Sequence, residues 1–141
     1  MFSITPSGSF TLLHTFCPTE DCLDGAAPVA PLVQGTDGDF YGVTSGGGAS
    51  SLGTVYKLSL GLLPFIKLLP ALGIIGQSIR VLGNNLLGAT GVAFNGTPAE
   101  FTVNTNSFIT AKVPAGATSG TVQVTTANGV LSSNVSFLVD R

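Results

Sequence analysis

The sequence predicts an all-β protein built mainly from antiparallel sheets. Short apolar segments are separated by turn residues about every 8–12 residues, which is typical of sandwiches and barrels. Glycine (19 residues) and proline (8 residues) are abundant, as in chains with many tight turns. Charged residues make up only 9% of the chain, too few for the exposed faces of a helical bundle.

The first half contains short strand patterns. A strand is predicted at residues 2–5 and another at 10–16, where Phe10, Leu12, His14 and Phe16 share one face. Residues 31–45 predict two strands joined by the turn sequence TDGD at 36–39. After a Gly/Ser loop at 45–53, a last strand is predicted at 54–60.

The second half contains six more strand patterns. Gly, Asn and Pro separate them, and Asn95-Gly96 suits a type I′ hairpin turn. The apolar run at 58–75 is interrupted by Pro64, Lys67 and Pro70, so no transmembrane segment is predicted there. The predicted strands are residues 78–83, 91–96, 99–105, 108–114, 120–126 and 135–139.

Charge is distributed unevenly along the chain. Residues 1–56 hold five acids and no Lys or Arg, for a charge of −5, whereas the rest holds five bases and two acids, for +3. Five scattered bases form no patch for phosphates, so nucleic acid is not an expected partner. The acidic half is suited either to attracting a cation or to keeping an apolar surface soluble.

Three motifs in order make the second half resemble an IPT/TIG domain. The opening motif runs from Gly76 to Asn85, a Val-x-Phe-Asn-Gly hairpin covers 92–96, and a Val-Pro-x-Gly-Ala turn begins at Val113. The resemblance implies an immunoglobulin-like β-sandwich over 71–141, preceded by a Pro-containing linker at 61–70.

The first half resembles a GloVer-type tandem repeat. The matching segments are FSITPSGSFTLLHTFC, DGAAPVAPLVQGTDGDFYGVTSGGG and GTVYKL. The resemblance implies a partial, propeller-like antiparallel meander over 1–60, about one and a half repeats, packed with the sandwich. Since such a fragment leaves open strand edges, we expect tightly docked halves or a homo-oligomer.

Both resemblances imply an extracellular or cell-surface bacterial protein, although no signal peptide is predicted within the chain. Paired thiols oxidise outside the cytoplasm, so we predict a disulfide between Cys17 and Cys22, the two cysteines present. The alternative is a zinc site completed by His14 and a carboxylate.

Asp21, Asp24, Asp37 and Asp39 are candidate ligands for a Ca²⁺ cofactor, because calcium prefers oxygen ligands. Turn chemistry is the competing explanation for the same Asp-Gly pairs.

Three further residues are candidates for functional roles. His14, the one histidine, is either a packing residue or a general base. Phe40 and Tyr41 are candidate ligand-binding aromatics, or else core residues.

The leading hypothesis is an extracellular binding or scaffolding module that binds carbohydrate or serves adhesion. The alternative is a small calcium-dependent hydrolase of esters, lactones or glycosides that uses the acidic loops and His14. The expected partner is accordingly a polysaccharide or a small acylated molecule. A third possibility is an assembly unit that associates by strand addition. No catalytic motif is present, so the sequence leaves the question of an enzyme open.

Overall fold

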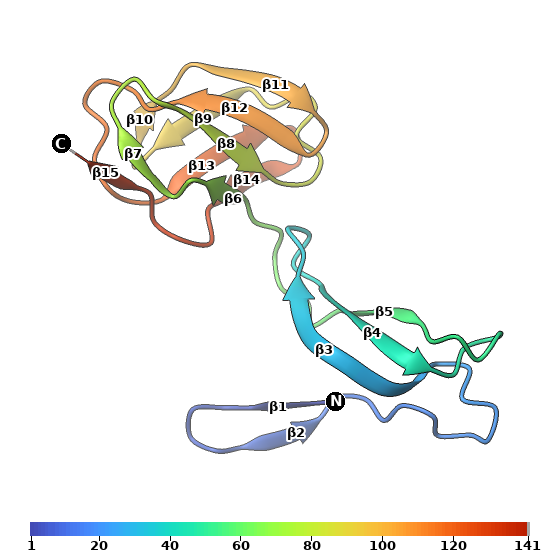
Figure 1. Ribbon diagram of the computed structural model, residues 1–141. Helices are drawn as coiled ribbons and strands as arrows, with labels where there is room; N and C mark the ends of the chain where they lie inside the picture. The colour runs from blue at the N-terminus through green and yellow to red at the C-terminus, as the bar shows by residue number, and fades with distance from the viewer. Residues whose placement is uncertain (141) are drawn as a thin grey trace. The chain divides into compact units, whose positions relative to one another are not determined.

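The computed structural model describes residues 1–140 and shows an all-β protein, which confirms the predicted fold class (Figure 1). The chain forms two compact units. The first comprises Met1–Gly35 and Asp39–Leu60, and the second comprises Thr36–Gly38 and the chain from Gly61 onward. Among the described residues, none belongs to a helix that is long and apolar enough to cross a membrane.

The first unit consists of a hairpin and a three-stranded sheet. Strands β1 (Phe2–Ile4) and β2 (Phe10–Leu12) pair antiparallel, and Phe2 lies opposite Leu12. The sheet has the order β3-β4-β5, with β3 at Ala26–Gln34, β4 at Phe40–Gly46 and β5 at Val55–Leu58. Both pairings in this sheet are antiparallel, so it is a simple meander.

The second unit contains two four-stranded sheets, with the orders β10-β9-β13-β14 and β11-β12-β8-β6, and a parallel pair of β15 with β7. The strands are β6 Lys67–Leu69, β7 Leu72–Ile74, β8 Ser78–Leu82, β9 Gly91–Phe94, β10 Thr97–Pro98, β11 Phe101–Thr105, β12 Phe108–Lys112, β13 Val122–Thr126, β14 Gly129–Ser132 and β15 Leu138–Asp140.

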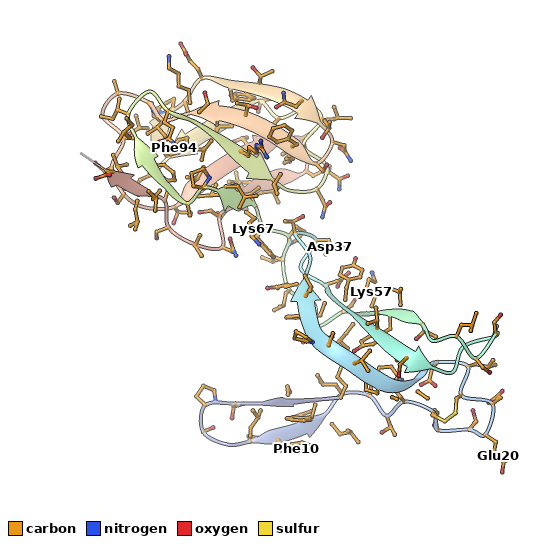
Figure 2. All side chains as sticks on the ribbon, in the orientation of Figure 1. Phe10, Glu20, Asp37, Lys57, Lys67 and Phe94 are labelled. Carbon is orange, nitrogen blue, oxygen red and sulfur yellow. A yellow bond between two sulfur atoms is a disulfide. The ribbon has the colours of Figure 1, made fainter. Side chains whose placement is uncertain are left out.

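The core of the second unit follows from alternation along its strands. Every second residue of β8, β9, β12 and β13 is buried, because successive side chains of a strand point to opposite faces. Phe94 (labelled in Figure 2) and Phe137 both belong to this core. Their rings meet edge to face, with centroids 5.1 Å apart. The two sheets therefore share one apolar core, as in a β-sandwich.

Some boundaries differ from the predicted ones. β2 ends at Leu12, well before residue 16, because the N–H groups of Leu13 and His14 both donate to the carbonyl oxygen of Met1. The stretch 61–70, expected to be a linker, contains β6 and the fully buried Ile66, so its second half belongs to the sandwich. Asn95 and Gly96 both have positive φ, as the predicted type I′ turn requires.

Burial differs sharply between the two units. All fourteen buried hydrophobic side chains of the described residues lie between Ile66 and Phe137, in the second unit. In the first unit, the buried positions are Gly25, Gly42 and Thr44. The first unit thus forms regular sheets while its apolar side chains stay wholly or partly exposed.

Candidate functional site

The opening loop of the first unit is closed by a disulfide between Cys17 and Cys22, which confirms the predicted pairing. Both cysteines adopt positive φ, so the chain turns tightly at each end of the loop. Gly25 follows at φ +100°, and a Cβ there would lie 2.5 Å from Thr44 Oγ1. Glycine therefore lets this loop pack closely against β4.

The loop holds Asp24 against His14. The Nε2 atom of His14 lies 2.8 Å from Asp24 Oδ2, and the backbone N–H of Cys17 donates to Asp24 Oδ1 at 2.9 Å. The Cys17 N–H, together with the His14 contact, holds the pKa of Asp24 below its ordinary value of 3.8. His14 is thus oriented by a carboxylate, and both side chains remain partly exposed.

A groove of about 400 Å³ opens beside this pair. Phe16 lies between His14 and Tyr56, with ring centroids 4.7 Å and 4.8 Å away. The consecutive residues Thr54–Leu58 line one wall. Since consecutive residues of a strand face opposite ways, this wall follows the length of β5, the last strand in the sheet order, and includes its backbone.

The Asp24 carboxylate makes stability depend on acid. The pKa of Asp24 is lower in the folded chain than in the unfolded chain. The ionised carboxylate therefore contributes its full stabilisation at a pH above the unfolded-state pKa. That stabilisation is lost as the pH falls through the folded-state pKa. We therefore expect the wild type to unfold at lower urea concentration below about pH 4.

In the Asp24→Asn variant this acid-dependent component should be reduced. Tyrosine fluorescence between pH 2 and 6 follows the unfolding, because Tyr41 and Tyr56 are the two tyrosines and both lie in the first unit. Identical pH dependences for the two proteins would contradict the role given to Asp24.

Three of the four candidate calcium ligands have different side-chain partners within the first unit. Asp21 accepts a hydrogen bond from Thr19, Asp24 contacts His14, and Asp39 pairs with Lys57 at 2.8 Å. Asp37 belongs to the second unit. Across residues 1–140, the structure brings no three His, Cys, Asp or Glu side chains together in a way that would hold a metal ion.

The two candidate aromatic residues on β4 are separated by the sheet. As neighbours on one strand, Phe40 and Tyr41 point to opposite faces. Tyr41 lines a shallow apolar hollow of about 260 Å³, together with Val33, Val43 and Val55. Phe40, opposite Gln34 and Leu58 in the pairing, is half-buried.

A larger groove, of about 570 Å³, lies wholly in the second unit. Its polar lining consists of four asparagines, one aspartate and the hydroxyl residues Thr126, Ser132 and Ser133. Its apolar lining includes Phe65, Leu63 and Leu131. We call it the asparagine groove and define it by Asp37, Asn84, Asn85, Asn128 and Asn134.

Hydrogen bonds fix the loops around the asparagine groove. The side-chain amide of Asn84 donates to Thr36 Oγ1 at 3.0 Å, and the N–H of Phe65 donates to the Thr36 carbonyl at 2.9 Å. The N–H of Asn134 donates to the carbonyl of the buried Ile66. The walls are therefore attached to the sandwich core.

Sequence reasoning did not identify the asparagine groove. Its residues come from separate parts of the chain, around positions 37, 63–65, 84–85 and 126–134. The available signal was the presence of asparagine in several turns, as in the GNN at 83–85 and the ANG at 127–129. Turn propensity explains each of these alone, so only the fold shows that they converge.

The composition of the asparagine groove defines the ligands that suit it. Amides both donate and accept hydrogen bonds, which matches hydroxyl groups, and an apolar patch matches the C–H face of a sugar ring. No Lys or Arg is among the described residues that line it, and Asp37 adds an acid, so an anionic ligand is disfavoured. The arrangement suits a neutral polyhydroxylated ligand.

No protein-family model matches the chain, and no curated protein does. Among solved structures, an auxiliary nutrient binding protein from Bacteroides ovatus is similar over 54% of this chain, with 20% identity and a TM-score of 0.48. SGBP-B of the Bacteroides ovatus mixed-linkage glucan utilization locus, in complex with a mixed-linkage heptasaccharide, is similar over 73%, with 15% identity and a TM-score of 0.42. The matches cover 20% and 29% of those two proteins. Likeness at this level carries no function from them to this chain.

Proposed function

We propose that the protein is an exported carbohydrate-binding module and that the asparagine groove binds a neutral glycan. The observation that carries the proposal is the convergence of four side-chain amides beside an apolar lining in one groove of the sandwich. Hydroxyl groups of a sugar need partners that both donate and accept, and asparagine supplies both. The Phe65 side chain and the two leucines offer an apolar surface to the sugar ring.

The disulfide supports the exported location. Disulfides persist in oxidising compartments and are rare in the cytosol, and Cys17–Cys22 closes the loop that places Asp24. The two four-stranded sheets of the second unit support the proposal that this unit is an IPT/TIG domain. The antiparallel meander of the first unit supports the proposed GloVer-type repeat.

Calorimetric titration of neutral and acidic oligosaccharides against the wild type tests the proposal. We expect saturable binding of a neutral glycan and no binding of sulfated or uronic acid chains. Asn128→Ala and Asn134→Ala should each weaken the binding about two- to tenfold, the loss of one hydrogen bond of 0.5–1.5 kcal/mol. Both side chains are exposed, so little change in stability is expected.

Asn104→Ala is the matched control. Asn104 is an exposed asparagine of the same unit, on β11 and outside the asparagine groove. It should leave the affinity unchanged. The proposal fails if no neutral glycan binds, or if the three variants weaken binding equally.

A second candidate function is favoured by the contact between His14 and Asp24. A histidine held by a carboxylate is the arrangement of a general base, and Leu13, Leu23 and Leu58 give the adjoining groove an apolar lining for an acyl chain. We infer that, if the chain hydrolyses esters or lactones, His14→Gln abolishes turnover and Asn128→Ala does not. Absence of turnover by the wild type across a panel of such substrates would eliminate this candidate.

A further inference from the structure

The first unit presents two exposed apolar faces. On the hairpin, Phe2 lies opposite Leu12 and Ile4 opposite Phe10, so all four side chains project from one face. Each of the four is about 60% exposed. Ser3 and Thr11 occupy the other face. We call the apolar side the hairpin face (Phe10 is labelled in Figure 2).

The second apolar face lies on the three-stranded sheet. The register places Val29, Val43 and Val55 in one row and Val33 and Tyr41 in the next, all on the same side. Val55 is 79% exposed and Val33 66% exposed. These five residues form the sheet face, and the apolar hollow beside Tyr41 lies on it.

Neither face suits a charged partner. The hairpin face holds no ionisable side chain, and the charged residue that shares the sheet face, Lys57, is paired with Asp39. Monomeric soluble proteins rarely leave apolar patches of this extent open to water. Both faces are therefore suited to binding another apolar surface.

We propose that the hairpin face of one copy of the chain packs on the sheet face of a second copy, and reciprocally, in a two-fold dimer. Two β-sheets pack face to face through apolar side chains, and the hollow beside Tyr41 offers room for a phenylalanine ring of the hairpin. A second copy supplies both complementary faces at once, so one two-fold contact covers all nine side chains. The inference is independent of the glycan proposal.

The area that the proposed dimer would bury is large enough for a stable interface. Nine large side chains at these exposures present on the order of 800 Å² per copy, and a two-fold contact would bury about twice that, the size of a standard stable interface. Phe2 and Phe10 are already stacked, with ring centroids 5.2 Å apart, so the hairpin face is ordered before association.

Light scattering coupled to size exclusion, on the oxidised full chain, tests the dimer. We expect twice the chain mass of 14.2 kDa for the wild type at micromolar concentration. Phe10→Asp on the hairpin face and Val55→Lys on the sheet face should each raise the dimer dissociation constant about tenfold or more. Thr11→Asp, on the polar face of the same hairpin, and Val135→Asp, an exposed valine of the second unit, should remain dimeric.

Mixing the two disrupted variants tests which faces meet. In a reciprocal dimer, the mixture of Phe10→Asp and Val55→Lys retains one intact junction. It should therefore form heterodimers at concentrations at which each variant alone is mainly monomeric. Recovery also shows that both variants are folded. A wild type that stays monomeric up to millimolar concentration would overturn the proposal, as would dimers unaffected by either substitution.

Discussion

Replacing Phe137 by alanine is expected to lower the free energy of unfolding of the second unit by about 3–5 kcal/mol. The ring is 1% exposed and packs edge to face on Phe94, so its removal leaves a cavity between the two sheets. The backbone of Phe137 also exchanges two hydrogen bonds with Gly120, so little collapse of the site is expected. Far-UV circular dichroism during urea unfolding measures the loss.

Leu138→Ala is the matched control for this prediction. Leu138 is the next residue along the chain and its side chain is 57% exposed, so the substitution should cost far less. A Phe137→Ala variant as stable as the Leu138→Ala variant would show that the two sheets do not share the core described above.

Removing the disulfide is the prediction with the next largest effect. The double variant Cys17→Ser, Cys22→Ser should lose about 2 kcal/mol of stability in the first unit, from the entropy of the opened loop. The loop also presents the Cys17 N–H to Asp24, so the contact with His14 should loosen as well. Tyrosine fluorescence reports this loss, because both tyrosines lie in the first unit.

Reduction of the wild type should produce the same shift in the tyrosine-detected transition, and a reducing agent should not affect the double variant. The second unit holds no cysteine, so its circular dichroism transition should change little. An oxidised and a reduced protein with equal midpoints would mean that the loop is held by its other contacts.

The class of the fold was predictable because it depends on local pattern. Strand alternation and turn residues are both visible within short segments of sequence. The Asn95-Gly96 turn, for example, was predictable from those two residues alone. The disulfide was also predictable, because the chain has two cysteines and both resemblances imply an oxidising location. Even the contact between His14 and Asp24 lies within ten residues of chain.

The remaining features depend on long-range placement. The pairing of Asp39 with Lys57, for example, joins the residue just before β4 to a residue of β5, and the short TDGD pattern gives no sign of it. The asparagine groove draws on distant segments that only the completed sandwich brings together. The end of β2 at Leu12 likewise depends on the Met1 carbonyl, which alternation along the strand cannot reveal.

The second unit is discontinuous in sequence, since the chain enters it at Thr36–Gly38, returns to the first unit at Asp39 and re-enters at Gly61. The short segment Thr36–Gly38 supplies Thr36, which accepts a hydrogen bond from Asn84, and Asp37, which lines the asparagine groove. A recombination event or an expression boundary at residue 61 would therefore separate the groove from part of its own wall. We therefore expect that the complete groove forms only when both units are kept in one chain.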